Sequence, residues 1–556
     1  MKKIWQKFYQ EGVPHSIDYP NITIPQFLEN TVKKYPKNIA ITFFGKKLNY
    51  KELSESVDRF ATALSDLGIK KGDKFSIFLP NCPQFVIAFF AALKVGAIVV
   101  NTNPLYVERE LIYQLNDSSC KTILCLDLLY PKVKNVKDKT ELKNIIVTSI
   151  KDYLPFPLNL LYPIKQRKEG HVVKIEKEPG LCFFKELLNK YSSSPPDVDT
   201  SQEEVALLQY TGGTTGISKG CMLTHKNLIA NTLQCGSWFV EAIEGKEIML
   251  SALPFFHVFG MTVVMLYSVQ SGFNMVLVPK FDTESVLKLV KKYRPTIFPG
   301  VPTMYSAINH YPNVEEYDLS SIKYCISGAA PLPVEVCKRF EELTGAKLVE
   351  GYGLTETSPV THCNPFEGLR KIGSIGLPFP DTDCRIMELE KGEKEVPIGE
   401  IGELAIFGPQ VMKGYLDKPD ETKAVLRDGW CYTGDIAKRD EDGYFYIVDR
   451  KKDMIISGGF NIYPREVEEV LYEHPKVREA AVVGIPDPKY GESIKAFVSI
   501  KEGEKTTEEE IIQFCKKNLA KYKIPKSVEF RKEMPKTLVG KVLRRVLVEE
   551  ELSKKK

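Results

Sequence analysis

The sequence alternates twice between helical apolar patterns and short runs of β-branched residues, and this alternation restricts the fold more than any other feature. From Ile24 to about Asp127, the 3.6-residue period of YKELSESVDRFATALSDLG is followed by the strand-like runs KFSIFLP and TILCLD. A similar alternation with glycine-bearing turns returns between Val205 and Glu350. It predicts parallel sheets covered by helices, arranged as two α/β subdomains.

Two further patterns follow these subdomains along the chain. From about Ser374 to Ile447, short strands separated by turn signals predict a small β-rich unit. After Arg450 a new α+β pattern begins, with Pro464 at the first position of a predicted helix. The charged run DRKKD joins the two patterns, so we place the boundary between a large N-terminal domain and a small C-terminal domain there.

The composition excludes several classes of protein. Hydrophobic residues make up 43% and charged residues 27% of the 556 positions, as expected for a globular protein with large cores. Lys and Arg number 76 against 72 Asp and Glu, and this net charge of +4 is too balanced for a protein whose main partner is nucleic acid. The 12 cysteines stand singly, without a CxxC pair or zinc spacing, and therefore favour a reducing cytoplasm.

Two apolar stretches bear on contact with membranes. Residues 85–100, FVIAFFAALKVGAIVV, are interrupted by Lys94 and Gly96 and are fewer than the ~20 that span a bilayer, so they predict a buried helix that runs into a buried strand. Residues 152–168, DYLPFPLNLLYPIKQRK, combine Phe, Leu and Tyr with three prolines and a basic tail, which makes a poor helix and an unusually apolar loop. Such side chains suit a lipid headgroup boundary, and packing on the protein's own surface is the alternative.

The strongest local signal is YTGGTTGISKG, residues 210–220, which follows the apolar run VALLQ. Its glycines let backbone N–H groups approach an anion, while hydroxyl groups and one lysine add donors and charge, as in a polyphosphate cradle. It lacks the GxxxxGKS/T pattern of a Walker A loop, and a structural turn rich in Gly and Thr is the alternative. The candidate phosphate-binding residues are Thr211, Gly212, Gly213, Thr214, Thr215, Gly216 and Lys219.

Six further motifs follow in order: PFFHVFG, SGAAPL, GYGLTETSP, YTGD, VDRKKDMIISGGFNIYPREVE and PKTLVGKVLRR. Together with the glycine-rich loop, they resemble the adenylate-forming superfamily of acyl-CoA synthetases, luciferases and peptide-synthetase adenylation domains. The resemblance covers nearly the whole chain, and DRKKDMI and NIYPREVE are most similar to bacterial long-chain fatty-acid CoA ligases. It implies a mobile C-terminal domain, so we expect an N-terminal domain over 1–449, a hinge over 450–453 and the mobile domain over 454–556.

The resemblance also implies roles for individual residues. Glu356 is expected to bind Mg²⁺ together with Thr214, since hard oxygen ligands suit a Mg²⁺ ion shared with ATP phosphates, and Thr355 is expected near the α-phosphate. Asp435 is expected to accept hydrogen bonds from the ribose hydroxyls, and Arg450 to help hold ribose and phosphate. The implied adenine slot consists of Gly328, Ala329, Ala330 and Tyr352, and Gly351 is expected among the ATP-binding residues.

Further residues match positions that act in catalysis or domain rotation. Lys541 resembles the catalytic lysine of adenylation, whose protonated amine neutralises charge as pyrophosphate leaves. Lys452 matches the hinge position, for which a plain charged linker is the alternative. His257 resembles the aromatic gate between the nucleotide and acyl pockets, and a hydrogen-bonded core histidine is its alternative. The implied CoA-binding residues are Ser457, Gly458 and Gly459.

We therefore expect an AMP-forming ligase that converts a fatty acid and ATP into acyl adenylate and pyrophosphate, then transfers the acyl group to CoA, with Mg²⁺ as cofactor. The segments PFFHVFGMTVVM and VPTMYSAI favour an apolar substrate over an amino acid, and the resemblance favours a long chain, while medium-chain and aryl acids stay open. The alternatives are an acyl-AMP ligase that loads a carrier protein and a non-catalytic lipid-binding protein on the same fold. The expected setting is the cytoplasm or the inner face of the membrane, and homodimer formation stays open.

Overall fold

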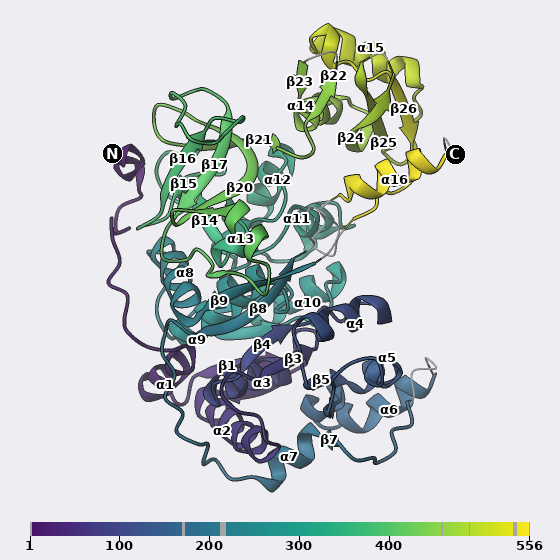
Figure 1. Ribbon diagram of the computed structural model, residues 1–556. Helices are drawn as coiled ribbons and strands as arrows, with labels where there is room; N and C mark the ends of the chain where they lie inside the picture. Colours follow the sequence, from purple (N-terminus) through teal and green to yellow (C-terminus); the bar gives the residue numbers. More distant parts are fainter. Residues whose placement is uncertain are drawn as a thin grey trace.

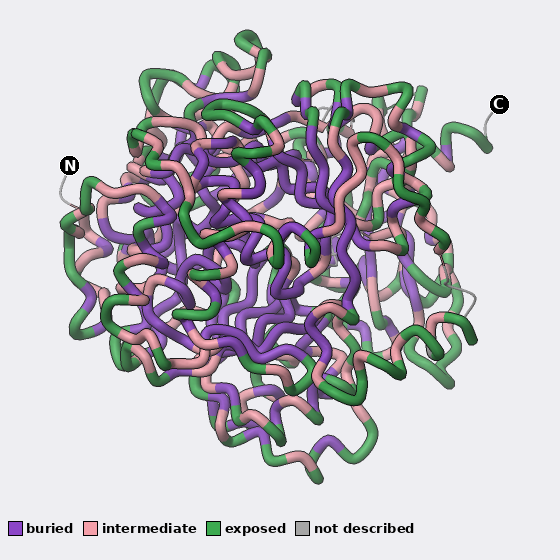
Figure 2. The backbone as a smooth tube through the Cα atoms, turned by 90° about the horizontal axis from the view of Figure 1, so that it is seen from below, coloured by how far each residue is buried: buried purple, intermediate pink, exposed green. Residues whose placement is uncertain are grey.

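The computed structural model describes residues 3–168, 173–211, 218–457, 460–488, 490–536 and 542–554, without the side chain of Lys165. Figure 1 shows a large N-terminal domain and, at the top of the view, a smaller C-terminal domain. Figure 2 shows that the buried backbone gathers in the interior of the large domain. Within the described ranges, no helix is both long enough and apolar enough to cross a membrane.

The largest sheet has eight strands in the order β18-β9-β8-β4-β3-β5-β6-β7. The strands from β8 to β7 run parallel to their neighbours, whereas β9 and β18 are antiparallel additions at one edge. In chain order the strands are β3 (Lys74–Phe78), β4 (Ile98–Asn101), β5 (Thr122–Leu126), β6 (Asn144–Thr148), β7 (Leu181–Phe183), β8 (Val205–Thr211), β9 (Lys219–Thr224) and β18 (Gly414–Tyr415). The parallel core of this sheet confirms the predicted α/β class.

Two four-stranded sheets, joined by bridges through Ile297, make up a second layer. The first has the order β10-β11-β1-β2 and the second the order β12-β13-β14-β15. Their strands are β1 (Ile39–Phe43), β2 (Lys46–Asn49), β10 (Ile248–Ser251), β11 (Asn274–Leu277), β12 (Tyr324–Ser327), β13 (Lys347–Gly353), β14 (Val360–Cys363) and β15 (Leu377–Pro378). The parallel pair β12–β13 places the ends of two glycine-bearing strands side by side, where open α/β sheets bind ligands.

Helices cover these sheets, and α3 (Pro83–Lys94) lies deepest among them. It packs against α1, α2, β3 and β4, so it is apolar on every side. Together with β4, it confirms the buried helix and strand predicted over residues 85–100. The other α-helices of this domain are α1 (Ile24–Lys34), α2 (Tyr50–Asp66), α4 (Glu108–Asp117), α5 (Tyr130–Lys137), α6 (Leu158–Lys168), α7 (Phe184–Lys190), α8 (His225–Trp238), α9 (Tyr267–Ser271), α10 (Thr283–Tyr293), α11 (Pro302–Asn309), α12 (Val334–Thr344) and α13 (Pro419–Val425).

The predicted β-rich unit is a five-stranded antiparallel sheet that completes the large domain. Its strands are β16 (Asp383–Met387), β17 (Gly402–Phe407), β19 (Leu426–Arg427), β20 (Trp430–Arg439) and β21 (Phe445–Arg450). The C-terminal domain has a sheet of the order β23-β22-β25-β24, to which β26 is added, and a separate core that contains Val467, Val482 and Ile511. Its elements are β22 (Ile455–Ser457), β23 (Phe460–Ile462), α14 (Pro464–Glu473), β24 (Val477–Asp487), β25 (Gly491–Ile500), α15 (Glu508–Asn518), β26 (Ser527–Phe530) and α16 (Arg544–Lys554).

Helix α6 corrects one expectation from the sequence. Residues 158–168 are helical, although the three prolines of this region suggested a poor helix. Pro155 and Pro157 precede the helix, and only Pro163 lies inside it, where a proline removes one backbone hydrogen bond. The apolar side chains of 158–168 are thus held on a helix.

Candidate active site

The predicted ribose-binding residues lie in contact on two neighbouring strands. Asp435 on β20 is paired in register with Arg450 on β21, and the Arg450 Nε atom lies 2.8 Å from Asp435 Oδ1. The Tyr352 hydroxyl, which comes from the end of β13, donates a 2.6 Å hydrogen bond to Asp435 Oδ2. Asp435 is only 2% exposed, so its charge depends on these two partners. The structure therefore brings three of the predicted nucleotide-binding residues together.

Glu356 lies in the turn that follows β13, where Tyr415 of β18 holds its carboxylate. The Tyr415 hydroxyl donates a 2.6 Å hydrogen bond to Glu356 Oε1, and the Met412 N–H donates to the Glu356 carbonyl at 2.8 Å. Burial and the neighbouring Glu356 charge raise the pKa of Tyr415, which keeps its hydroxyl protonated as a donor. One carboxylate oxygen of Glu356 is thereby oriented by the protein.

The same tyrosine connects Glu356 to the glycine-rich loop. The Lys219 ammonium lies 5.2 Å from the centre of the Tyr415 ring, and the Leu416 N–H donates to the Gly220 carbonyl at 2.8 Å. Thr211 and Lys219 are paired across β8 and β9, and the Ser218 hydroxyl donates to the Thr211 carbonyl at 2.6 Å. The two ends of the predicted phosphate loop therefore meet beside Glu356. The predicted residues Gly212, Gly213, Thr214, Thr215 and Gly216 lie outside the described residues.

The implied adenine slot lies where β12 and β13 end side by side. A Cβ atom at Gly328 would stand 3.0 Å from the Phe259 ring and 3.5 Å from the Gly351 carbonyl oxygen, so this position accepts little beyond glycine. Ala329 has a φ of 68°, and its side chain is exposed. The structure thus gathers Gly328, Ala329, Gly351 and Tyr352 at one sheet edge, with Ala330 next along the chain.

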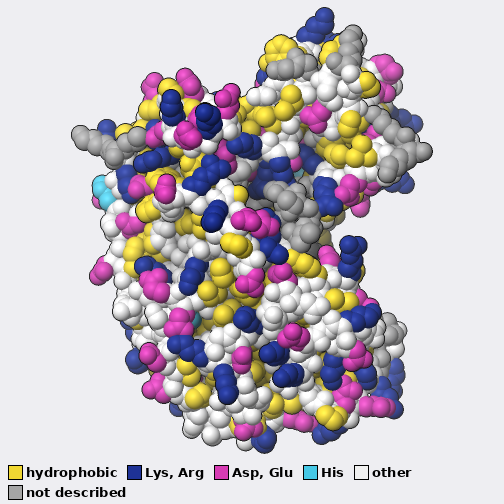
Figure 3. Space-filling view, in the orientation of Figure 1, with side chains coloured by type: hydrophobic (Ala, Val, Ile, Leu, Met, Phe, Trp, Pro, Cys, Tyr) yellow, Lys and Arg dark blue, Asp and Glu magenta, His cyan; other side chains and the backbone are white. Residues whose placement is uncertain are grey.

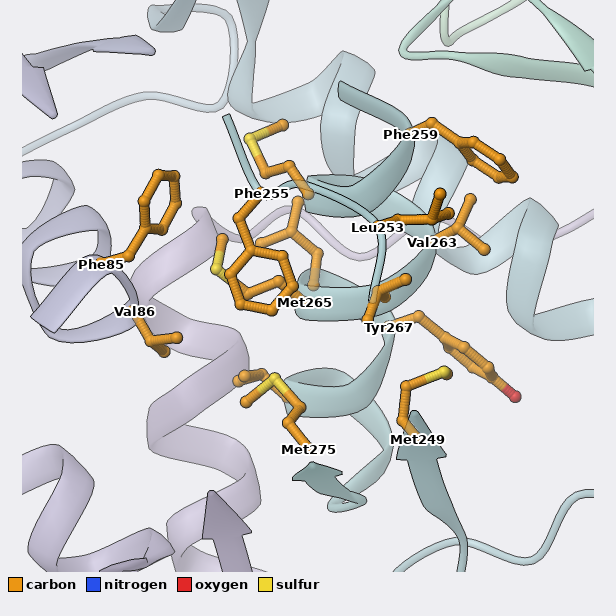
Figure 4. Close-up of a cluster of buried hydrophobic side chains, with 14 of the residues drawn as sticks. Phe85, Val86, Met249, Leu253, Phe255, Phe259, Val263, Met265, Tyr267 and Met275 are labelled. Carbon is orange, nitrogen blue, oxygen red and sulfur yellow. The ribbon is translucent and has the colours of Figure 1, made fainter. Parts of the chain in front are cut away.

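His257 is a neutral side chain beside a large apolar cluster. Its Nδ1 accepts a 3.3 Å hydrogen bond from the Phe259 N–H, and burial lowers its pKa to about 4. The π-helical residues Gly260–Leu266 follow it, and Figure 4 shows Phe255, Val263 and Met265 among the side chains of the cluster, with the Phe259 ring at its edge. A neutral histidine at an apolar boundary is compatible with a gate and offers no acid catalysis at neutral pH.

The segment between the two domains is tied to β17 and β20. The Lys451 N–H donates to the Gly434 carbonyl at 2.9 Å, and the Lys451 ammonium lies 2.9 Å from Glu403. The side chain of Lys452, the predicted hinge residue, is exposed. Ser457 ends β22, where it pairs with Gly491. The other predicted CoA residues, Gly458 and Gly459, and the predicted catalytic Lys541 lie outside the described residues.

Charged residues that the sequence analysis did not single out join the two domains. Asp449 accepts hydrogen bonds from the Arg450 and Arg465 N–H groups, both at 2.7 Å, and the Arg465 guanidinium donates to the Ile447 carbonyl at 2.9 Å. Burial raises the pKa of Asp449 to about 6. In the helix α16, Arg544 pairs with Glu468 at 2.6 Å and Asp453 at 3.2 Å. These contacts hold the first turn of α14 against the end of β21.

Glu350, next to the adenine slot, provides a pH-dependent prediction. Burial raises the pKa of this carboxyl to about 7, although Arg465 and the Leu332 backbone lower it. Between pH 4.5 and 7 the folded protein keeps a proton that the unfolded chain has released, so stability falls as pH rises. We expect Glu350→Gln to raise stability by up to about 3 kcal/mol at pH 8 and to change it little at pH 4. Urea unfolding of both proteins at the two pH values measures this.

The exposed Glu335 on α12 supplies the control for that measurement. Glu335→Gln should leave the difference between pH 4 and pH 8 unchanged. A Glu350→Gln protein with the same pH dependence as the parent would show that Glu350 ionises normally in the folded state.

The surface between the two domains carries positive charge beside the predicted nucleotide site (Figure 3). Figure 3 shows the surface hollowed between the two domains, with Lys and Arg side chains along the hollow. Among the described residues, no group of three or more His, Cys, Asp or Glu side chains could hold a metal ion by itself. Glu356 would therefore share any Mg²⁺ with other ligands such as phosphate oxygens, which is the usual form of a nucleotide-bound Mg²⁺ site.

Comparisons with known proteins match both domains. The family model described as AMP-binding enzyme covers residues 28–416, and the model described as AMP-binding enzyme C-terminal domain covers residues 466–541. A long-chain-fatty-acid–CoA ligase from Bacillus subtilis (strain 168) is 50% identical over 553 residues, 99% of this chain and 98% of that protein.

Solved structures of one protein match in two forms. The crystal structure of ATP-bound MatB from Rhodopseudomonas palustris is 29% identical and has a TM-score of 0.83, with 95% of this chain and 99% of that chain covered. The apo form of MatB is 30% identical over 96% and 99% of the two chains, and its TM-score is 0.74. Since one family model spans well over half of the chain and the relative from Bacillus subtilis matches nearly all of it, this chain belongs to the AMP-binding enzyme family.

Proposed function

We propose that this chain is an AMP-forming fatty-acid–CoA ligase with a preference for long-chain acids. The observation that carries the proposal is the 50% identity, over 99% of the chain, to the long-chain-fatty-acid–CoA ligase of Bacillus subtilis. The geometry agrees with it, because the described part of the site contains a buried carboxylate paired with an arginine, an oriented glutamate and a lysine at a glycine-rich loop.

In the first half-reaction, the substrate carboxylate attacks the α-phosphorus of ATP and pyrophosphate leaves. We assign the ribose to Asp435 and Arg450 and the adenine to the slot beside Tyr352. We assign the phosphates to Lys219 and to the loop that begins at Thr211, and we place Thr355 near the α-phosphate. The hydroxyl of Tyr352 is held by Asp435, so the ring is fixed in position to stack on a flat base.

Glu356 and Thr214 are the proposed protein ligands of Mg²⁺. A half-buried carboxylate with one oxygen fixed by Tyr415 fits an ion that takes only one or two protein carboxylates. Bound there, Mg²⁺ would neutralise negative charge on the phosphate oxygens.

In the second half-reaction, the CoA thiol attacks the acyl carbonyl and AMP leaves. We propose that the domain over 454–556 turns about the hinge 450–453, with Lys452 at its centre, and that Ser457, Gly458 and Gly459 then line the CoA site. The higher TM-score against ATP-bound than apo MatB supports an arrangement of the two domains like that of the ATP-bound form here. The Asp449–Arg465 contacts would stabilise this arrangement.

The test is the formation of AMP and acyl-CoA by the purified chain with ATP, Mg²⁺ and CoA, across saturated acids from short to long and one aryl acid. We expect equal amounts of AMP and thioester, with the highest kcat/KM for long chains. Pyrophosphate exchange without thioester would instead identify an acyl-AMP ligase that loads a carrier protein. A maximum at medium-chain or aryl acids would refute the proposed chain length.

A further inference from the structure

Helix α6 exposes an unusual number of apolar side chains to solvent. Phe156 before the helix is 78% exposed, and Leu160 on it is 63% exposed. Leu158, Leu161 and Ile164 are also exposed. Single exposed apolar residues are common, but a run of five within nine positions marks a surface that binds something apolar.

These side chains point outward although the segment itself is firmly attached. Tyr153 and Leu154, just before Phe156, are buried, and Tyr162 of α6 packs against the main core. Tyr153, Leu154 and Tyr162 thus lie on the side that faces the core, and the exposed apolar residues lie on the side that faces solvent. This excludes, for these described side chains, packing on the protein's own surface.

A second element, far away in sequence, enlarges the surface. Phe44, at the turn between β1 and β2, is 53% exposed. The next residue, Gly45, faces Pro155, whose Cγ atom would lie 4.0 Å from a Cβ atom at Gly45. We call the joint surface the α6 patch, and its members are Phe44, Phe156, Leu158, Leu160, Leu161 and Ile164.

Basic residues flank the α6 patch. The Lys46 ammonium lies 5.0 Å from the centre of the Tyr153 ring. Burial and the neighbouring charge of Lys185 both lower the pKa of Lys46. The negative charges of Asp152 and Glu52 raise the pKa of Lys46. Each of these carboxylates also accepts a hydrogen bond from a backbone N–H at the start of a helix. Further exposed cations on or beside the segment are Lys47, Lys151, Arg167 and Lys168.

We propose that the α6 patch docks the enzyme on a bilayer that contains anionic lipids. Leu and Phe side chains on a surface helix enter the boundary between headgroups and acyl chains, while neighbouring Lys and Arg side chains contact the anionic headgroups. Figure 1 shows α6 at the end of the molecule opposite the C-terminal domain, so a bilayer there leaves that domain free to move. The proposal rests on the proposed function in one respect: long-chain acids partition into bilayers, and docking brings the enzyme to its substrate.

The test uses the full chain and sedimentation with vesicles of phosphatidylcholine, with and without phosphatidylglycerol. The variant Leu160→Glu/Leu161→Glu places two charges in the α6 patch. The matched control is Ile398→Glu/Ile401→Glu, since both isoleucines are exposed in the distant loop before β17. We expect the parent and the control to bind phosphatidylglycerol vesicles, and to bind them more weakly at high salt. The patch variant should bind at least about tenfold more weakly than the parent. Phe156→Ser, a milder change, should weaken binding in the same direction.

Several outcomes would overturn the proposal. Equal binding of the parent and both patch variants would refute it, as would no binding of the parent to any vesicle. If sedimentation velocity shows that the patch variant turns a dimer into a monomer while no protein binds vesicles, the patch is an interface between two copies instead. Ligase activity on dispersed acid separates this test from that of the function: vesicle binding without ligase activity in the parent would refute the proposed function and leave the docking intact. With both intact, the patch variant should raise the apparent KM only for acid presented in vesicles.

Discussion

Lys541→Ala is expected to lower the rate of acyl-adenylate formation by about 10²–10³-fold, the usual loss when one preorganised group that stabilises transition-state charge is removed. The described residues on the two sides of Lys541 contact each other. Lys536 and Val542 form an antiparallel bridge, and the Leu543 N–H donates to the Pro535 carbonyl at 2.8 Å. Exchange of labelled pyrophosphate into ATP, in the presence of the acid, measures the adenylation step directly.

Arg545→Ala provides the control for Lys541→Ala. Arg545 lies close by on α16, is exposed and pairs with Glu549 at 2.6 Å, so its loss removes a cation of the same segment at little cost. We expect unchanged exchange in this control. Synthetic acyl adenylate should still be converted to thioester by Lys541→Ala, because no pyrophosphate leaves in that step. Unchanged exchange in Lys541→Ala would refute the assigned role.

Much of the fold follows from local sequence patterns. The helix α2 was predictable from its apolar period of 3.6 residues, and the strands β3 and β5 were predictable as short, mostly apolar runs. Pro464 begins α14 as expected. The order of strands was not predictable, because β4 pairs with β8 more than a hundred residues later in the chain. Pairing at that distance depends on tertiary packing, which periodicity does not describe.

The residues of the candidate site also divide into those that the sequence predicted and those that it did not. Motifs identified Asp435, Arg450 and Glu356, and the structure places the first two in direct contact. Tyr415 escaped notice because it lies 59 residues from Glu356, in the short segment KGYLD, whose only signal is one aromatic residue between turns. Asp449 and Arg465 stand in quoted motifs, but their contact joins positions 16 residues apart, and no local pattern predicts it. The sequence motifs thus identify the residues predicted to contact the substrates better than they identify the residues that orient them.

Asp435→Asn is expected to raise the KM for ATP by about 10–100-fold with a smaller effect on kcat. An asparagine of the same shape can still accept the hydrogen bond from Tyr352, but it loses the charge that faces Arg450 at 2.8 Å and that would receive the ribose hydroxyls. Charge-assisted hydrogen bonds contribute about 1.5–3 kcal/mol each, which corresponds to the stated range. Initial rates of AMP formation at varied ATP and saturating acid measure both constants.

Glu403→Gln separates ribose binding from loosening of the sheet. Glu403 is also buried in this sheet, accepts the Gly434 N–H at 3.1 Å and pairs with Lys451 at 2.9 Å, but it has no contact with Asp435 or Arg450 among the interactions above. Its neutralisation removes a comparable ion pair next to the same turn, so it should lower thermal stability and leave the KM for ATP within about twofold of the parent. Equal increases of KM in the two variants would show that the charge of Asp435 acts by holding β20 and β21 together. A large increase confined to Asp435→Asn would place that charge on the nucleotide itself, because only there does the carboxylate contribute to binding beyond the fold.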